Sequence, residues 1–257
     1  MDFKNMGKVS VITPSYNSAD FISETIESVQ SQTYTNWEMI IVDDCSKDQS
    51  VKLIEAKQSE DERIKLIKLM RNGGPAYARN QAILAADGRY LAFLDSDDQW
   101  HPQKLEKQIL FMHQNGYSFS YTAYRIMQEE GNPTEVVFHM PSQITYKDLL
   151  KNTAIGTLTV VLNQEKLGKV QMPLYRDCSE DYGLWMSILS HGVTAYGLNE
   201  ELALYRKCNE SLSSNKWKSA RKTWNTYRKV GRSNLPSTMW YFLNYSVRAM
   251  RKHTRTS

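Results

Sequence analysis

The first hundred residues alternate regularly between short apolar runs and amphipathic segments, and this alternation constrains the fold more than any other feature. The runs have the length and β-branched content of strands, and the segments between them carry apolar residues at helical spacing. Such an order predicts an α/β fold, with a Rossmann-like, mainly parallel sheet and helices on both faces. The expected strands span residues 8–13, 37–42, 64–69 and 89–94, and the expected helices span 18–32, the segment through Val51, Ile54 and Ala56, and 75–86.

Polar clusters follow three of the expected strands. They are Pro14, Ser15 and Tyr16 after the first strand, Asp43 and Asp44 after the second, and Asp95, Ser96, Asp97 and Asp98 after the fourth. The carboxyl ends of parallel strands meet at one edge of a sheet, where open α/β sheets bind ligands, so we expect these clusters to lie close together. Carboxylate oxygens suit Mg²⁺ or Mn²⁺, but the sequence Asp-Ser-Asp-Asp is also typical of a turn or a helix N-cap.

Beyond residue 100 the strict alternation ends. Residues 117–127 alternate like a half-exposed strand, and we expect residues 136–139 to pair with them across the intervening turn. An amphipathic helix is expected at 180–190, with Glu180 and Asp181 in its first turn, where the helix dipole favours ionised carboxylates. The other expected elements are helices at 101–115 and 146–150 and strands at 157–162, 193–198 and 202–206.

Several separated motifs resemble the signatures of family 2 glycosyltransferases. They are VSVITPSYNSADFISETIESVQSQTYTNWEMIIVDDCSKDQS, GGPAYARNQAILAADGRYLAFLDSDDQW, the pair Glu180–Asp181 ahead of LW, and LALYRKCNESLSS. The resemblance covers about residues 7–206 in the same order and spacing. It implies an A-type glycosyltransferase fold over residues 1–215, with a nucleotide-binding half at about 1–100 and an acceptor-binding half at 101–215.

The resemblance also implies roles for individual residues. Pro14, Ser15, Tyr16 and Asp44 match positions that hold the nucleotide base, Asp43 matches the ribose side, and Arg79 matches an arginine near the base and diphosphate. Asp95, Ser96 and Asp97 match the DxD motif, in which Asp97 would bind the metal and Asp95 the ribose or the metal. Asp181 falls on the catalytic base, with Glu180 and Trp185 as supporting residues. No role is implied for Asp98.

A further element of the family is a loop that closes on the diphosphate. Arg206 and either Ser211 or Ser213 match its arginine and serine positions. Cys208 stands where histidine is common, and because that histidine is a metal ligand in some members, the composition of the metal shell stays open.

The implied function is metal-dependent, inverting transfer of one sugar, with Mn²⁺ or Mg²⁺ as cofactor. The donor would be a nucleotide-sugar, UDP-linked by family habit. Residues 144–173 resemble members that build bacterial surface polysaccharides such as O-antigens, which implies a lipid-linked oligosaccharide acceptor. The QxxRW motif of processive synthases is absent from the sequence, which favours one transfer per binding event. The alternatives are a nucleotidyltransferase on a similar sheet and a membrane-associated nucleotide-sugar-binding protein without turnover.

The C-terminal segment has a different charge from the rest of the chain. Residues 216–257 contain eleven Lys and Arg and no Asp or Glu, whereas residues 1–215 contain 21 basic and 28 acidic residues. Two amphipathic helices with Trp and Tyr are expected, at about 217–230 and 239–250. Basic aromatic helices favour an anionic membrane surface. The alternative is packing on the catalytic domain, and nucleic-acid binding is disfavoured because it leaves the acidic body unexplained.

The expected location is the cytoplasm, peripheral on the inner face of the cytoplasmic membrane. The N-terminal residues lack the basic start and apolar core of a signal peptide, and no apolar run reaches the ~18 residues that span a bilayer. Three widely separated cysteines predict neither a disulfide framework nor a zinc site, which fits a reducing compartment. The oligomeric state is left open.

Overall fold

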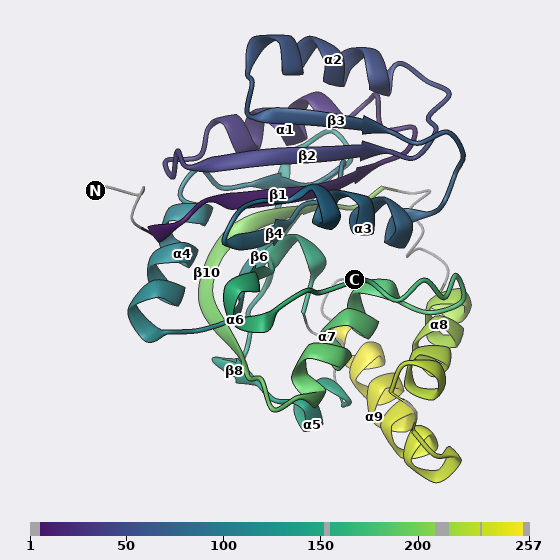
Figure 1. Cartoon of the computed structure of the whole chain (residues 1–257). Helices are drawn as coiled ribbons and strands as arrows, with labels where there is room; N and C mark the ends of the chain where they lie inside the picture. The colour runs from purple at the N-terminus through teal and green to yellow at the C-terminus, as the bar shows by residue number, and fades with distance from the viewer. Residues whose placement is uncertain (1–5, 152–154, 209–215, 232, 254–257) are drawn as a thin grey trace.

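The computed structural model describes residues 6–151, 155–208, 216–231 and 233–253 (Figure 1). Within these residues ten strands form one sheet in the order β3-β2-β1-β4-β9-β6-β10-β5, with β7 paired to β6 and β8 paired to β10. The first four strands in the chain are parallel, as predicted, and β2 is buried along its whole length because both faces of the sheet are covered. These strands are β1 (Val9–Ser15), β2 (Trp37–Asp43), β3 (Ile64–Lys68) and β4 (Tyr90–Phe93).

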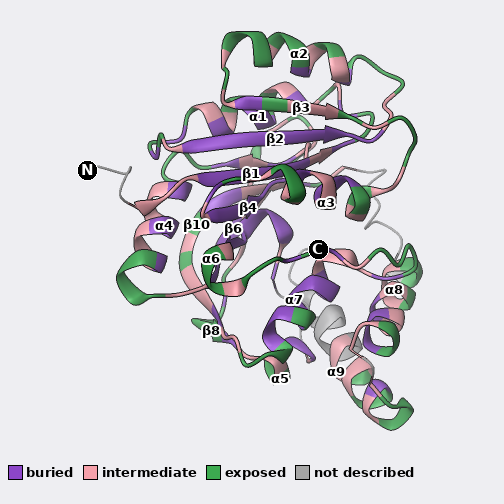
Figure 2. Cartoon of the chain, viewed as in Figure 1, coloured by how far each residue is buried: buried purple, intermediate pink, exposed green. Residues whose placement is uncertain are grey.

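Helices cover both faces of this parallel part. Helix α3 (Pro75–Ala85) lies in front of β1 and β4, while α1 (Ile22–Gln30) lies behind the sheet and α2 (Ser50–Glu60) flanks β3 (Figure 1). The central strands are almost wholly buried, whereas the helices expose their outward faces (Figure 2). Pro75 occupies the start of α3, where a backbone N–H would have no hydrogen-bond partner within the helix, so its absence in proline costs nothing.

The second half of the chain extends the sheet with mixed pairing. Strand β9 (Val161–Asn163) is antiparallel to both β4 and β6 and so joins the two halves. The predicted pairing across the 127–133 turn is confirmed, because β7 (Pro133–Phe138) is antiparallel to β6 (Phe119–Met127). The remaining strands are β5 (Gln99–Trp100), β8 (Gln143–Ile144) and β10 (Ala195–Arg206), and α4 (Lys104–Asn115) packs on β6 and β10.

Two predicted strand boundaries were wrong. Residues 157–162 are not one strand, because Thr157–Thr159 form a 3-10 helix, η2, closed by the bond from Val160 N to Thr157 O, and β9 starts only at Val161. Residues 193–198 and 202–206 are not two strands but parts of β10. The polar residues between them are accommodated by register shifts around Glu201, a bulge that bends the strand without ending it.

The helical C-terminal extension is confirmed. It consists of α8 (Lys216–Lys229) and α9 (Leu235–His253), which packs against α8 (Figure 1). Helix α8 in turn packs against α7 (Glu180–Ser190), which lies under the sheet beside α5 (Tyr146–Leu149). The short helix α6 (Gln164–Leu167) flanks β9. Tyr227 of α8 is fully buried, whereas Trp217, expected on the same face, is 89% exposed. In the part of the chain that the structure describes, no helix has both the length and the hydropathy needed to cross a bilayer.

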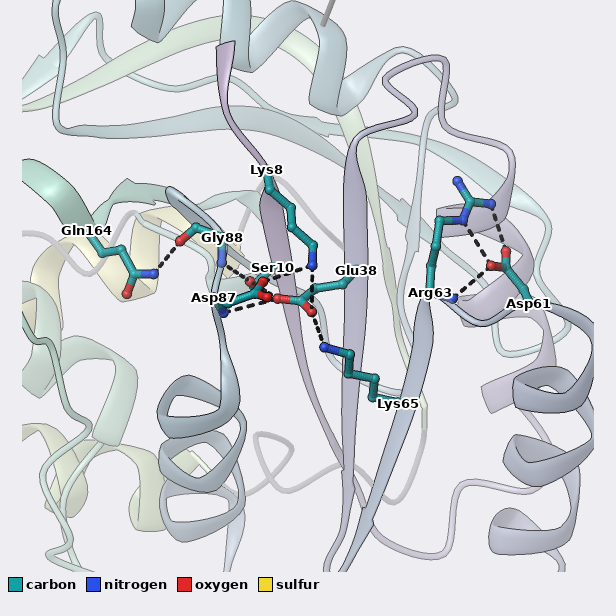
Figure 3. A network of polar contacts seen from close by, with 9 residues as sticks. All are labelled: Lys8, Ser10, Glu38, Asp61, Arg63, Lys65, Asp87, Gly88 and Gln164. Atoms are coloured by element: carbon teal, nitrogen blue, oxygen red, sulfur yellow. Dashed lines mark hydrogen bonds and ion pairs between the residues drawn. The ribbon is translucent and has the colours of Figure 1, made fainter. Parts of the chain in front are cut away.

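A buried carboxylate fixes the amino end of the sheet, opposite the polar clusters (Figure 3). Glu38, the second residue of β2, is 1% exposed and accepts hydrogen bonds from Ser10 Oγ at 2.6 Å and Asp87 N at 3.2 Å. Its other oxygen pairs with Lys8 Nζ at 3.1 Å and Lys65 Nζ at 2.6 Å. Burial by itself raises the pKa of Glu38, but the surrounding hydrogen bonds, those of Asp87, Lys65 and Ser10 foremost, lower it below its usual range.

The variant Glu38→Gln should lower the free energy of unfolding by about 1–3 kcal/mol at pH 7, because the amide keeps the shape but leaves Lys65 without this counter-charge and Lys8 with Asp87 alone. The pKa of Glu38 is lower in the folded protein than its ordinary 4.5. Its stabilisation is therefore complete above about pH 5 and is lost as the pH falls below that. Urea unfolding at pH 7 and pH 3.5, followed by circular dichroism, should show the difference between wild type and variant shrinking at the lower pH.

The matched control is Glu55→Gln. Glu55 pairs with Lys68, also a lysine of β3, but both side chains are more than half exposed, so we expect no measurable change. A similar loss in both variants, or a difference from wild type that stays constant with pH, would contradict the role assigned to Glu38.

Candidate active site

The polar clusters meet at the carboxyl edge of the parallel strands, as the sequence predicts. The chain leaves β1 toward β2 and β3 on one side and returns to β4 on the other, so β1 and β4 form the topological switch point where α/β sheets bind ligands. Ser15, at the end of β1, bonds through its hydroxyl to Ser18 at 2.7 Å. Tyr16 is half exposed beside it. Asn17 has a φ of 48° and accepts from Lys47 N at 2.8 Å, which ties the loop after β1 to the loop after β2.

Asp43 and Asp44 are both buried at the end of β2 but have different surroundings. The two carboxylate oxygens of Asp44 accept hydrogen bonds from Gly73 N at 2.6 Å and Gly74 N at 2.7 Å, which fixes the loop that leads into α3. Asp43 accepts from Ser46 N at 3.0 Å through one oxygen, and no donor among the described residues reaches its other, buried oxygen. Asp43 therefore retains an acceptor that a ligand hydroxyl or N–H can use.

Arg79 joins the Asp cluster to the start of α7. It lies on α3, is 5% exposed, and donates to Asp95 Oδ1 at 2.5 Å and to Glu180 Oε1 at 2.9 Å. Burial alone would lower the pKa of Arg79, but the two carboxylates raise it above its ordinary value, so the guanidinium stays charged. The structure thus brings together three predicted site residues that lie up to 101 positions apart.

Asp97 and Asp98 face different environments. Burial, with the nearby charge of Asp95, raises the pKa of Asp97 to about 6. Asp98 points inward and accepts from Arg206 N at 2.9 Å, and burial raises its pKa as well. Asp98, which had no implied role, therefore anchors the end of β10, whereas Asp95 pairs with Arg79.

Arg206 supports the Asp cluster from behind. Its buried guanidinium donates to Asp97 O at 2.7 Å, Glu129 O at 2.5 Å and Glu24 Oε2 at 2.6 Å, and it lies over the Phe21 ring at 4.7 Å. All of these partners are groups of the protein itself. Contact of Arg206 with a diphosphate stays a prediction.

Of the other residues of the predicted closing loop, the structure describes Cys208. Ser211 and Ser213 lie outside the described residues. Cys208 is partly exposed, and burial followed by the charge of Asp97 raises the pKa of its thiol. The thiol therefore lies near the Asp cluster.

Asp181 lies in the first turn of α7, and each of its carboxylate oxygens accepts a hydrogen bond. Oδ1 accepts from Tyr182 N at 2.7 Å and Oδ2 from Thr157 Oγ1 at 2.7 Å. Burial, followed by the neighbouring charge of Glu180, raises the pKa of Asp181. Thr157 is a site residue that sequence reasoning missed, because residues 157–162 were expected to be a regular strand and no motif marks this hydroxyl.

Trp185 supports this helix from the core. It is buried and packs edge-on against Phe93 at 5.5 Å and Phe119 at 5.2 Å between ring centroids. It fixes α7 against the sheet, and its supporting role in the site stays a prediction.

Relatives with known names align along nearly the whole chain. A protein of Bacillus subtilis (strain 168), whose name assigns it to teichuronic acid biosynthesis as the glycosyltransferase TuaG, is 49% identical over 244 residues, covering 95% of this chain and 96% of that protein. An Escherichia coli protein named UDP-Glc:alpha-D-GlcNAc-diphosphoundecaprenol beta-1,3-glucosyltransferase WfgD is 42% identical over 246 residues, covering 95% of this chain and 94% of that protein.

Solved structures share the fold at lower identity. TarS of S. aureus, residues 1–349 in complex with UDP-GlcNAc, matches with a TM-score of 0.72 at 22% identity, over 88% of this chain and 66% of that one. The mannosyltransferase PcManGT from Pyrobaculum calidifontis, in complex with GDP-Man and Mn2+, matches with a TM-score of 0.67 at 16% identity, over 93% of this chain and 68% of that one. These likenesses confirm the predicted A-type glycosyltransferase fold.

The family model described as Glycosyl transferase family 2 matches residues 10–171, which include the loop after β1, both acids after β2, Arg79 and the whole Asp cluster. The match spans more than half of the chain, and the two aligned relatives extend the likeness across α7 and the C-terminal helices. The chain therefore belongs to glycosyl transferase family 2.

Proposed function

We propose that the protein transfers one sugar from a UDP-sugar to a hydroxyl of a lipid-linked oligosaccharide in bacterial surface polysaccharide synthesis, with inversion at the anomeric carbon. The observation that carries this proposal is the Arg79 bridge, which sets the Asp95–Asp97 cluster and Asp181 on two sides of one site. Two Escherichia coli relatives, 42% and 41% identical, are named as glucosyltransferases that use UDP-Glc and a diphosphoundecaprenol-linked sugar.

The nucleotide would lie along the ends of β1 and β2. Pro14, Ser15 and Tyr16 would line one side of the base, and Asp43 and Asp44 the other. The oxygen of Asp43 that no described donor reaches is a buried acceptor, and leaving such a group unpaired costs about 1–3 kcal/mol. A donor N–H or hydroxyl from the nucleoside would satisfy it.

The residues present fit a divalent metal. Asp95 and Asp97 supply hard oxygen ligands, and they lie close enough that the charge of Asp95 helps to raise the pKa of Asp97. Mg²⁺, and by the same preference Mn²⁺, is commonly bound by one or two carboxylates together with substrate phosphates. When bound, the metal would stabilise the negative charge that develops on the nucleoside diphosphate leaving group. Ser96 holds the turn between the two acids, since its carbonyl accepts from Thr25 Oγ1 at 3.0 Å.

Asp181 would remove the proton from the acceptor hydroxyl. Its carboxylate accepts one hydrogen bond from Thr157 and one from the Tyr182 amide. The remaining lone pairs can accept the proton of the hydroxyl to which the sugar is transferred. Burial raises its pKa, and a general base works best when its pKa approaches the operating pH. A single displacement with one base inverts the configuration.

The variant Asp181→Asn should retain binding of UDP and Mn²⁺ and lose transfer by roughly 10²–10⁴-fold, the usual size of a general-base contribution. The assay incubates the full chain with Mn²⁺, a panel of UDP-sugars including UDP-Glc and UDP-GlcNAc, and a synthetic GlcNAc-diphosphate lipid. Release of UDP and formation of product are followed together. Binding of UDP and Mn²⁺ is measured by calorimetry.

The control for this test is Asp20→Asn, an exposed acid near the same edge of the sheet, which should behave like wild type. Full transfer by Asp181→Asn would remove Asp181 as the base. Release of pyrophosphate when UTP and a sugar 1-phosphate replace the UDP-sugar would identify a nucleotidyltransferase. Binding without any turnover across the panel would support a binding protein instead.

We also propose that α9 contacts an anionic membrane surface, which would bring the site to a lipid-linked acceptor at the inner face of the cytoplasmic membrane. Leu235, Met239 and Leu243 recur every four residues and form one stripe, with Trp240 beside it. These four side chains are between 53% and 62% exposed. The segment 216–257 has eleven basic residues and no acidic one. Basic charge attracts anionic lipid, and the apolar stripe would insert at the interface.

Changing the stripe should release the protein from membranes while leaving the fold intact. The triple variant Met239→Ser/Trp240→Ser/Leu243→Ser should float with vesicles containing 30% phosphatidylglycerol at least ~10-fold less than wild type. This estimate follows from about 25 cal/mol per Å² of apolar surface removed from the interface. Leu84→Ser on α3, which removes another strongly exposed leucine, is the matched control and should float normally. Equal flotation of the triple variant and wild type would contradict membrane docking through α9.

A further inference from the structure

One face of α8 is hydrogen-bonded to the segment that leads into α7. Thr226 Oγ1 accepts from Ser179 N at 2.9 Å while donating to Lys222 O in its own helix at 2.8 Å. Asn225 Nδ2 donates to the backbone carbonyl of Asp177 at 3.0 Å and to its carboxylate at 3.1 Å. These contacts hold Asp177 and Ser179, both within three residues of Glu180, without touching Glu180 or Asp181.

A second contact joins α8 to Tyr182, the residue after Asp181. The hydroxyls of Tyr182 and Tyr227 lie 3.3 Å apart and donate to the neighbouring carbonyls Leu149 O and Leu150 O, each at 2.8 Å. Both rings are buried and meet edge-on, with centroids 5.9 Å apart. The first turn of α7 is therefore held by α8 on both sides of Asp181.

The first turn of α7 has little to fix it from within. Ser179 is its N-cap residue, but its side chain makes no capping hydrogen bond. The amide of Tyr182 is engaged by Asp181 itself. Helix termini without caps fray unless other groups satisfy them. Gly183 allows Pro173 to approach this turn closely, since a Cβ there would lie 2.7 Å from the Pro173 side chain.

We infer that α8 positions the catalytic base, with Thr226 and Tyr227 as positioning residues that hold the first turn of α7 in place. The inference rests on the proposed function of Asp181. Thr226 acts through the backbone of Ser179, and Tyr227 acts through the Tyr182 hydroxyl and the end of α5. A displacement of about 1 Å at a reacting group can cost roughly 10²-fold in rate, so a loss of either contact reaches the chemistry.

The basic C-terminal segment thereby has two separate roles. Helix α8 faces the catalytic domain, and α9 packs on α8 through Trp224 and Phe242, whose ring centroids lie 5.3 Å apart. Removing residues 216–257 would delete the membrane stripe and the support of Asp181 together. Loss of activity in such a truncation would not distinguish the two roles, so single substitutions are needed.

The test compares Thr226→Val with Thr223→Val. Thr223 is also buried and lies one turn earlier on α8, and among the described residues its hydroxyl bonds within the helix alone, to Ser219 O at 3.1 Å. In the assay with Mn²⁺, the GlcNAc-diphosphate lipid and the UDP-sugar that wild type uses fastest, Thr226→Val should lower kcat by roughly 10–100-fold. The KM for the donor should stay within about twofold because Ser179 and Lys222, to which the Thr226 hydroxyl bonds, are not residues of the nucleotide site. Thr226→Ser, which keeps the accepting oxygen, should restore most of the rate, and Thr223→Val should match wild type.

Hydrogen exchange of the full chain gives a readout that does not depend on turnover. Peptides covering residues 178–184 should exchange faster in Thr226→Val than in Thr223→Val. If Thr226→Val is too unstable to purify, Asn225→Ala, at the edge of the contact, should show the same changes at smaller size.

Three results would overturn the inference. They are equal kcat for Thr226→Val and Thr223→Val, an effect on the donor KM alone, and no rescue by Thr226→Ser. Loss of transfer in Asp181→Asn but not in Thr226→Val would overturn the role of α8 and leave the proposed function standing. Full transfer by Asp181→Asn would instead overturn the proposed function.

Discussion

The ion pairs of Arg79 with Asp95 and Glu180 connect the two halves of the site, and the other features of the carboxyl edge depend on them. Asp95 ends the parallel half of the sheet and Glu180 begins α7, and neither half could place both groups alone. Removing one partner of a buried ion pair commonly costs about 3–5 kcal/mol, because the remaining charge is left without compensation. The main effect of these two ion pairs is therefore geometric. With Arg79 in place, Asp181, next to Glu180, is held in position relative to the Asp cluster.

A second buried arginine completes this arrangement from the other side. Arg206 bonds to the backbone of Asp97 and Glu129 and to the side chain of Glu24 on α1, while its own amide holds Asp98. The hydroxyl of Thr25, next to Glu24, donates to the backbone carbonyls of Ser96 and Asp98. The turn that carries the acids is thus fixed by α1 and β10 in addition to its own backbone bond from Asp98 N to Asp95 O at 3.2 Å.

Local sequence patterns predicted the parallel half of the fold well, because each strand and helix there is encoded by its own periodicity. The same reasoning placed the loop after β1, Asp43, Asp44 and the Asp cluster at one edge, since parallel strands must end together. It failed for Thr157, whose 3-10 turn reads locally as a β-branched strand, and for β10, where a bulge hides the continuity across Glu201. It also could not predict that Glu24 pairs with Arg206, or that Thr226 reaches Ser179. Those partners lie 182 and 47 positions apart, and no local pattern encodes such contacts.

The charges at this edge indicate the form in which a donor would arrive. Asp95, Asp97, Asp98, Glu180 and Asp181 lie near two arginines, and both guanidinium groups are already engaged by protein groups. Burial first, and repulsion between neighbouring carboxylates second, raise the pKa values of Asp97, Asp98 and Asp181. A bare diphosphate would meet further repulsion there, whereas a diphosphate already paired with a divalent cation would bring the missing positive charge. On the proposed function, metal and donor would therefore favour each other's binding, and the surplus of carboxylates would act as a selection for the metal-bound donor.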